Sequence, residues 1–91
     1  MNETSQYQLI DGLFEPQEAG KILFTLVGNK INYHTMEILS IKERYNGDVS
    51  NSEKRVEELK NISKALRTLI DNAIEQKKQL QINSVIEIKF V

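Results

Sequence analysis

The chain has 91 residues, 40% of them hydrophobic, and its 12 Lys and Arg side chains nearly balance 13 Asp and Glu, giving a net charge of −1. This length suits a single domain over residues 1–91 with a thin core. The balanced charge provides no broad field for attracting nucleic acid or an anionic membrane, and the lack of cysteine excludes disulfides, thiolate metal sites and cysteine nucleophiles.

The N-terminal segment MNETSQYQLI has neither a basic region nor a long apolar run, which predicts that it is no signal peptide. No apolar run approaches the roughly 20 residues that span a bilayer. We therefore expect a soluble cytoplasmic protein with no membrane partner. Without disulfides, its stability must come from helix packing or from a second subunit.

Residues 1–5 are polar and are expected to be disordered. Residues 6–14 predict a strand, in which Gly12 permits a bulge or twist. Three apolar residues would share one face, with Asp11 between them: Tyr7, Leu9 and Leu13. A tight hairpin at Asp11–Gly12 is the alternative, but too few apolar residues follow it to make a second strand.

Residues 16–45 predict a helix that begins with Pro16, where the missing N–H costs nothing. Apolar residues recur in steps of three and four, a pattern typical of one helix face: Phe24, Val27, Ile31, Ile38, Ile41 and Tyr45, with His34 in the gap. Gly28 and Asn29 disfavour helix without shifting this phase. We favour one continuous helix over two helices that meet at this dipeptide.

Residues 51–79 predict a second helix. Gly47 is a good left-handed residue for ending the first helix, and Ser50 with Glu53 makes a capping box for the second. Its apolar side comprises Val56, Leu59, Ile62, Leu66, Leu69, Ile70, Ala73 and Ile74. Because few residues separate the helices, they should fold back as an antiparallel hairpin with matched lengths.

Residues 80–91 alternate between apolar and polar side chains and predict a second strand. The first strand enters the helical hairpin and the second leaves it at the same end, so the two should pair antiparallel. The expected fold is α+β, with the order β-α-α-β.

An isolated two-stranded sheet is marginally stable, and both of its strands are edges. One face can rest on the near ends of the helices, but the open edge of residues 80–91 is apolar. The simplest cover is a second copy of the chain, which predicts a homodimer with a four-stranded intersubunit sheet or a helical bundle. The alternative is a monomer whose edges are hidden by twist and by the N-terminal residues.

His34 is the only histidine. As a general base or metal ligand it would need partners, and Glu37 is the only acidic residue one helical turn away. We favour the interpretation that His34 has a structural role, either lining the contact between the helices with a hydrogen bond across the pair or lying at the rim of that contact. No catalytic, cofactor-binding or metal site is predicted, and we expect the protein not to be an enzyme.

Two sets of polar residues are candidates for partner recognition. The first lies near the hairpin tip and is more simply a solvated helix face: Lys30, Asn32, Tyr33, Glu37, Lys42, Glu43 and Arg44. The second is a basic set on the second helix that would contact nucleic acid: Lys54, Arg55, Lys60, Lys64 and Arg67. Nearby acidic residues dilute the basic set, which disfavours phosphate binding: Glu57, Asp71 and Glu75.

Three carboxylates, Asp11, Glu15 and Glu18, cluster near the junction of the first strand with the helix. Glu15 and Glu18 suit the positive end of a helix dipole, so a catalytic role is disfavoured. The leading interpretation is a self-associating protein-interaction module with an unidentified protein partner. A small regulator that binds nucleic acid through the second helix is the alternative.

The motifs YQLIDGLFEPQEAGKIL, KINYH, ERYNGD, SEKRVEELK and LQINSVIEI resemble a family of short uncharacterised bacterial proteins over Tyr7–Ile88. In that family a Thr or Ser commonly precedes the proline, where this chain has Glu15. The resemblance implies a weaker N-cap here and the same fold, and it implies no catalytic or binding residue.

Overall fold

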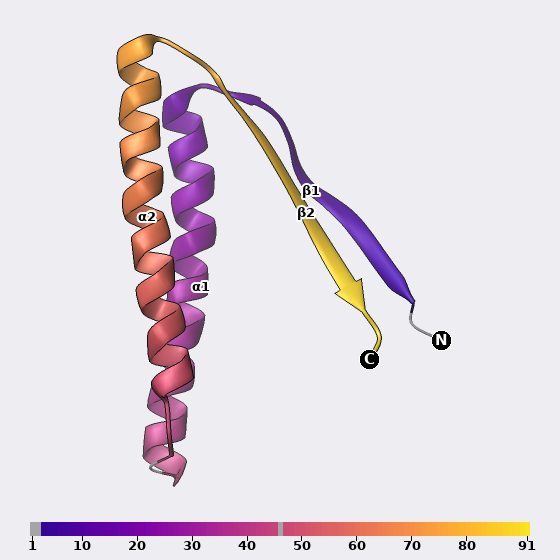
Figure 1. Cartoon of the computed structure of the whole chain (residues 1–91), viewed down its shortest axis with the longest axis vertical. Helices are drawn as coiled ribbons and strands as arrows, with labels where there is room; N and C mark the ends of the chain where they lie inside the picture. Colours follow the sequence, from indigo (N-terminus) through magenta and orange to yellow (C-terminus); the bar gives the residue numbers. More distant parts are fainter. Residues whose placement is uncertain (1–2, 46) are drawn as a thin grey trace.

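The structure is a computed structural model that describes residues 3–45 and 47–91. Strand β1 (Thr4–Phe14) leads into helix α1 (Pro16–Tyr45), and helix α2 (Ser50–Gln76) is followed by strand β2 (Leu80–Lys89). The two helices lie side by side as an antiparallel hairpin, and the strands form an antiparallel two-stranded sheet (Figure 1). The predicted α+β fold with β-α-α-β order is confirmed.

Helix α1 is continuous for 30 residues through Gly28 and Asn29, as predicted. On each helix, the residues that face the other helix recur in alternating steps of four and three. This spacing keeps them along the line of contact. On α1 these residues include Gly20, Phe24, Val27, Ile31, His34 and Ile38. On α2 they are Ser52, Val56, Leu59, Ser63, Leu66, Ile70 and Ala73.

The predicted apolar side of α2 is only partly correct. Leu59, Ile70 and Ala73 are buried, whereas Ile62, Leu69 and Ile74 remain exposed. The three exposed residues flank the line of contact with α1, and one helix can cover only one stripe of its neighbour. The hairpin therefore leaves apolar surface on α2 without a partner.

The ends of α2 differ from the prediction. The capping box is wrong: Ser50 makes no side-chain cap, and its backbone N–H donates instead to Asp48 Oδ1 at 2.9 Å. The C-terminus comes at Gln76 and not at residue 79, because Lys77 adopts a left-handed conformation with φ of 54°. The N–H of Lys77 bonds to Ile74 and that of Lys78 to Ala73, which closes the helix in a Schellman motif. The ending predicted at Gly47 depends on residue 46, which lies outside the described residues.

The first strand begins at residue 4 and not at residue 6. Thr4 pairs with Lys89 and Ser5 with Ile88, so the expected disorder of residues 1–5 is wrong for these two residues. Residues 1 and 2 lie outside the described ones. The second strand ends at Lys89 and not at residue 91, although Phe90 still donates its N–H to the carbonyl of Glu3 at 3.1 Å.

The bulge in β1 lies at Leu9 and not at Gly12. Gln8 is opposite Val85 and Ile10 is opposite Ser84, which leaves Leu9 as the extra residue. The bulge changes the phase of the strand, so the expected grouping of Tyr7 with Leu13 on one face is also wrong. One face of the sheet is largely apolar, and we call it the apolar sheet face: Tyr7, Ile10, Gly12, Phe14, Leu80, Ile82, Ser84, Ile86 and Ile88.

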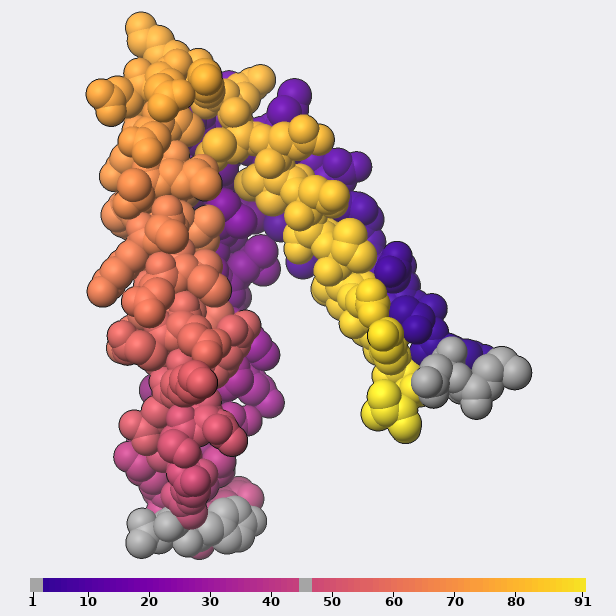
Figure 2. Space-filling view, in the orientation of Figure 1, coloured from indigo at the N-terminus to yellow at the C-terminus, as the bar shows by residue number. Residues whose placement is uncertain are grey.

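The sheet contacts the helices only near the helix ends where both strands connect. From there it diverges from α1, so that the hairpin and the sheet form two arms joined at one end (Figures 1 and 2). At this joint, Gln79 Nε2 donates a hydrogen bond to Glu15 Oε1 at 3.0 Å. The chain measures 50 × 36 × 15 Å with a radius of gyration of 16.7 Å. A compact domain of this length would have a radius of gyration of about 12 Å.

Candidate interaction surface

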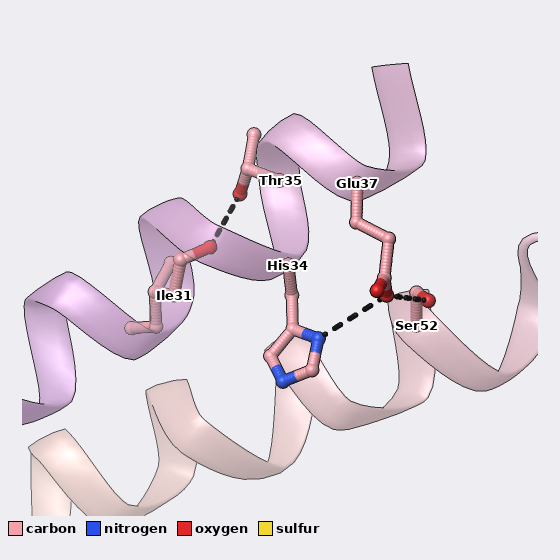
Figure 3. A network of polar contacts seen from close by, with 5 residues as sticks. All are labelled: Ile31, His34, Thr35, Glu37 and Ser52. Carbon is pink, nitrogen blue, oxygen red and sulfur yellow. Dashed lines mark hydrogen bonds and ion pairs between the residues drawn. The ribbon is translucent and has the colours of Figure 1, made fainter. Parts of the chain in front are cut away.

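His34 lies on the line of contact between the helices, with a side chain that is 15% exposed (Figure 3). Its Nδ1 is 3.5 Å from Glu37 Oε1, a long and weak contact. The same carboxylate oxygen accepts a hydrogen bond of 2.7 Å from Ser52 Oγ of α2. The connection between the helices therefore runs through Glu37. We call these three residues the His34–Glu37–Ser52 cluster.

The electrostatics of this cluster favour the charged form of Glu37. The hydrogen bond from Ser52, followed by the contact with His34, holds the pKa of Glu37 below its ordinary value of 4.5. His34 Nε2 is buried and has no hydrogen-bond partner among the described residues. The cluster thus provides one polar link between helices, and no group of three potential metal ligands occurs in residues 3–45 and 47–91.

The polar set near the hairpin tip is held partly by contacts within α1. Lys30 Nζ lies 4.7 Å from the centre of the Tyr33 ring, and that ring meets the His34 ring edge-on at 5.3 Å. Tyr33 nevertheless keeps 58% of its surface exposed, and the neighbouring Met36 keeps 65%. Both residues lie on the side of α1 that faces away from α2.

The basic set on α2 is divided between different contacts. Arg55 pairs with Glu58 at 3.0 Å, one turn away. The guanidinium of Arg67 lies over the Phe24 ring, 4.8 Å from its centre, in a cation–π contact. Lys54, Lys60 and Lys64 are exposed. The set is therefore not one uninterrupted basic surface, because contacts within the chain engage Arg55 and Arg67.

The carboxylates near the first helix do not form one constellation. Glu15 accepts the hydrogen bond from Gln79 at the joint, while Asp11 pairs with Asn83 within the sheet. Glu18 is exposed in the first turn of α1, where it complements the helix dipole. The start of α1 accounts for the positions of Glu15 and Glu18, and the polar face of the sheet accounts for that of Asp11.

Several large apolar side chains remain exposed on the sheet and on α1. On the apolar sheet face, Tyr7, Ile86 and Ile88 keep between 42% and 59% of their surface exposed. Nearer the joint, an open apolar groove of about 410 Å³ separates β1 from α1 and is lined by Leu9, Ile10, Lys21, Ile22, Thr25 and Leu26. No large side chain among the described residues is fully buried.

The apolar second strand was predicted from its alternating pattern, but the exposed stripe of α1 that begins at this groove was not predicted. Leu26, Tyr33 and Met36 are exposed and Ile22 is half-buried, and the four recur at helical spacing on the side away from α2. That spacing is the signal that would have revealed the stripe.

Comparison of the chain with protein-family models, curated proteins and solved structures found no match. No helix in the described part of the chain combines the length and apolar character needed to cross a membrane.

Proposed function

We propose that this chain is a non-enzymatic protein-interaction module that works as a homodimer and presents its helix faces to a partner protein. One observation carries the proposal: the isolated chain exposes far more surface than a stable monomer of its mass. The proposal assigns the apolar sheet face and the adjoining side of α1 to contacts between proteins.

The surface that the chain exposes beyond that of a compact monomer can be estimated from its accessible surface area. The chain exposes 7279 Å², whereas a folded monomer of 10.5 kDa exposes about 5,400 Å². The excess of about 1,900 Å² is larger than the roughly 800 Å² that each partner contributes to a standard interface. The excess exposed surface is therefore large enough to form an interface with a second copy, and such an interface would explain the open shape of the chain.

The chemistry of the surface agrees with a binding role. Buried interface centres are rich in aromatic residues and Met and poor in charge, and the exposed residues Tyr7, Tyr33 and Met36 are of these types. Polar side chains at the same sites would be expected if the faces were solvated permanently. The groove between β1 and α1 is open, and helix packing accounts for the His34–Glu37–Ser52 cluster.

Sedimentation equilibrium from about 1 µM to about 1 mM tests the proposal, because this range covers dissociation constants typical of weak to moderately stable dimers. We expect twice the 10.5 kDa chain mass over the upper part of this range. Small-angle scattering on the same samples reports the shape. A mass of 10.5 kDa at every concentration would overturn the proposal, whatever radius of gyration accompanies it.

A further inference from the structure

The two edges of the sheet differ in their capacity to pair with another strand. Strand β2 runs for ten residues without a proline or an irregularity, and every residue from Val85 to Lys89 is exposed. A long, regular and exposed edge is a template for a further strand. This inference rests on the proposed function, because it asks where a second copy binds.

The edge of β1 is interrupted. The bulge at Leu9 divides the strand, and the side chain of Gln8 reaches across it to the carbonyls of Ile10 and Ser84 and to the side chain of Asn83. Only Thr4–Gln8 remains regular on the far side of the bulge. Bulges twist an edge away from straight pairing, so the geometry disfavours β1 as the pairing edge.

The backbone groups that β2 presents at its open edge follow from one hydrogen bond. Phe90 donates its N–H to Glu3 of β1, and residues of an antiparallel strand direct their backbone groups alternately to one side and the other. The even-numbered residues of β2 therefore bond to β1. The odd-numbered residues direct their N–H and carbonyl groups outward: Gln81, Asn83, Val85, Glu87 and Lys89.

We infer that β2 pairs antiparallel with β2 of a second copy, about a twofold axis at Val85, to make a four-stranded sheet. In this register Val85 lies opposite Val85 of the other copy, Asn83 opposite Glu87, and Gln81 opposite Lys89. The five outward residues of each copy then form about ten backbone hydrogen bonds across the axis.

This register also places compatible side chains opposite one another. A twofold axis perpendicular to the sheet keeps the apolar sheet faces of both copies on the same side, where Ile86 of one copy lies opposite Ser84 of the other. Glu87 and Lys89 each meet a neutral side chain, so no two like charges lie directly opposite. The combined apolar sheet face is continuous and has four strands, which is sufficient for a stable sheet.

Proline substitution tests the edge without breaking the sheet within one chain. Val85→Pro removes an N–H that β1 does not use, and proline is tolerated at such positions of an edge strand. Gln6→Pro is the matched control, since Gln6 directs its backbone outward on the edge of β1. We expect Val85→Pro to weaken dimerisation at least 100-fold, with circular dichroism unchanged, and Gln6→Pro to leave dimerisation within threefold of the wild type.

A second measurement does not depend on proline being tolerated. Because the chain contains no cysteine, Val85→Cys and Gln6→Cys each accept a single nitroxide label. We expect strong dipolar broadening for the label at residue 85, whose twofold mate lies on the adjacent strand. The label at residue 6 should show little, because two strands of β2 separate the copies of β1.

The outcomes separate this inference from the proposed function. A dimeric wild type with no broadening at residue 85, and with dimerisation unaffected by Val85→Pro, would overturn β2 pairing and leave self-association standing. Loss of dimerisation in Gln6→Pro alone would transfer the interface to β1 and equally overturn the inference. A monomeric wild type would overturn both proposals.

Discussion

Gly28 is the most informative single position for testing the continuous helix α1. It lies in the helix interior, and a Cβ built on it would meet nothing within 4 Å. Glycine in such a position costs about 1 kcal/mol relative to alanine, because it loses more conformational freedom on folding. Gly28→Ala is therefore expected to raise the free energy of unfolding by about 1 kcal/mol, and the melting temperature by about 4–8 °C.

The measurement is a pair of urea and thermal unfolding curves recorded by circular dichroism at one fixed protein concentration, because the proposed dimerisation would make stability depend on concentration. Asn29→Ala at the exposed neighbouring position should add about 0.5 kcal/mol, and Gly28→Pro should cost about 3 kcal/mol or more. An unchanged or lowered stability in Gly28→Ala would refute an uninterrupted helix with open space beside residue 28.

Two further substitutions test the His34–Glu37–Ser52 cluster. Because the pKa of Glu37 in the folded chain is below its ordinary value of 4.5, its charge stabilises the fold above that pH, and this contribution is lost as the pH falls through the lower, folded value. Glu37→Gln should flatten the decline in melting temperature below pH 4.5, and an unaltered acid profile would contradict the assignment. His34→Leu removes the buried, unpartnered Nε2 and should stabilise the chain by about 1 kcal/mol in urea unfolding; a clear loss of stability would show that the imidazole makes a bond leucine cannot replace.

The order of elements was predictable because each long segment has one unambiguous period. The apolar steps of α1 keep their phase through Gly28 and Asn29, so the pattern favoured one helix despite two poor helix formers. Apart from Ser84, Val85 and Val91, residues 80–91 alternate between apolar and polar side chains, which no helix does. Once two helices of similar length were expected with a short connection, the antiparallel pairing of the terminal strands followed from geometry.

The ends of the helices were not predictable, because several neighbouring residues are chemically able to cap or end a helix. Asp48 and Ser50 are both good capping residues, and only the path of the connection decides that Asp48 accepts the hydrogen bond. The left-handed residue after α2 is Lys77, a position where glycine would have been the usual signal. The bulge at Leu9 likewise carries no glycine to indicate it.

The division of apolar residues between core and surface was the hardest feature to predict. Ser52 and Ser63 lie on the contact face of α2, while Ile62 and Leu69 lie outside it. A hydrophobic pattern shows that a residue prefers burial but does not show what buries it. Which apolar residues of α2 stay exposed depends on how much of its surface α1 covers, and this is set by the packing of the whole chain.

The joint between the two arms has a consequence for how the chain folds. Glu15 and Gln79, which bond there, are separated by 64 positions in the sequence, and pairing of the strands from the unfolded chain would have to close a loop of that size. Formation of the helical hairpin first brings these positions together, so that strand pairing closes an effective loop of only about 4 residues, which lowers the entropic cost of closure by about 2.5 kcal/mol. We therefore expect the helices to form early through local contacts. The pairing of β1 with β2 is then the last step, and it proceeds outward from the joint.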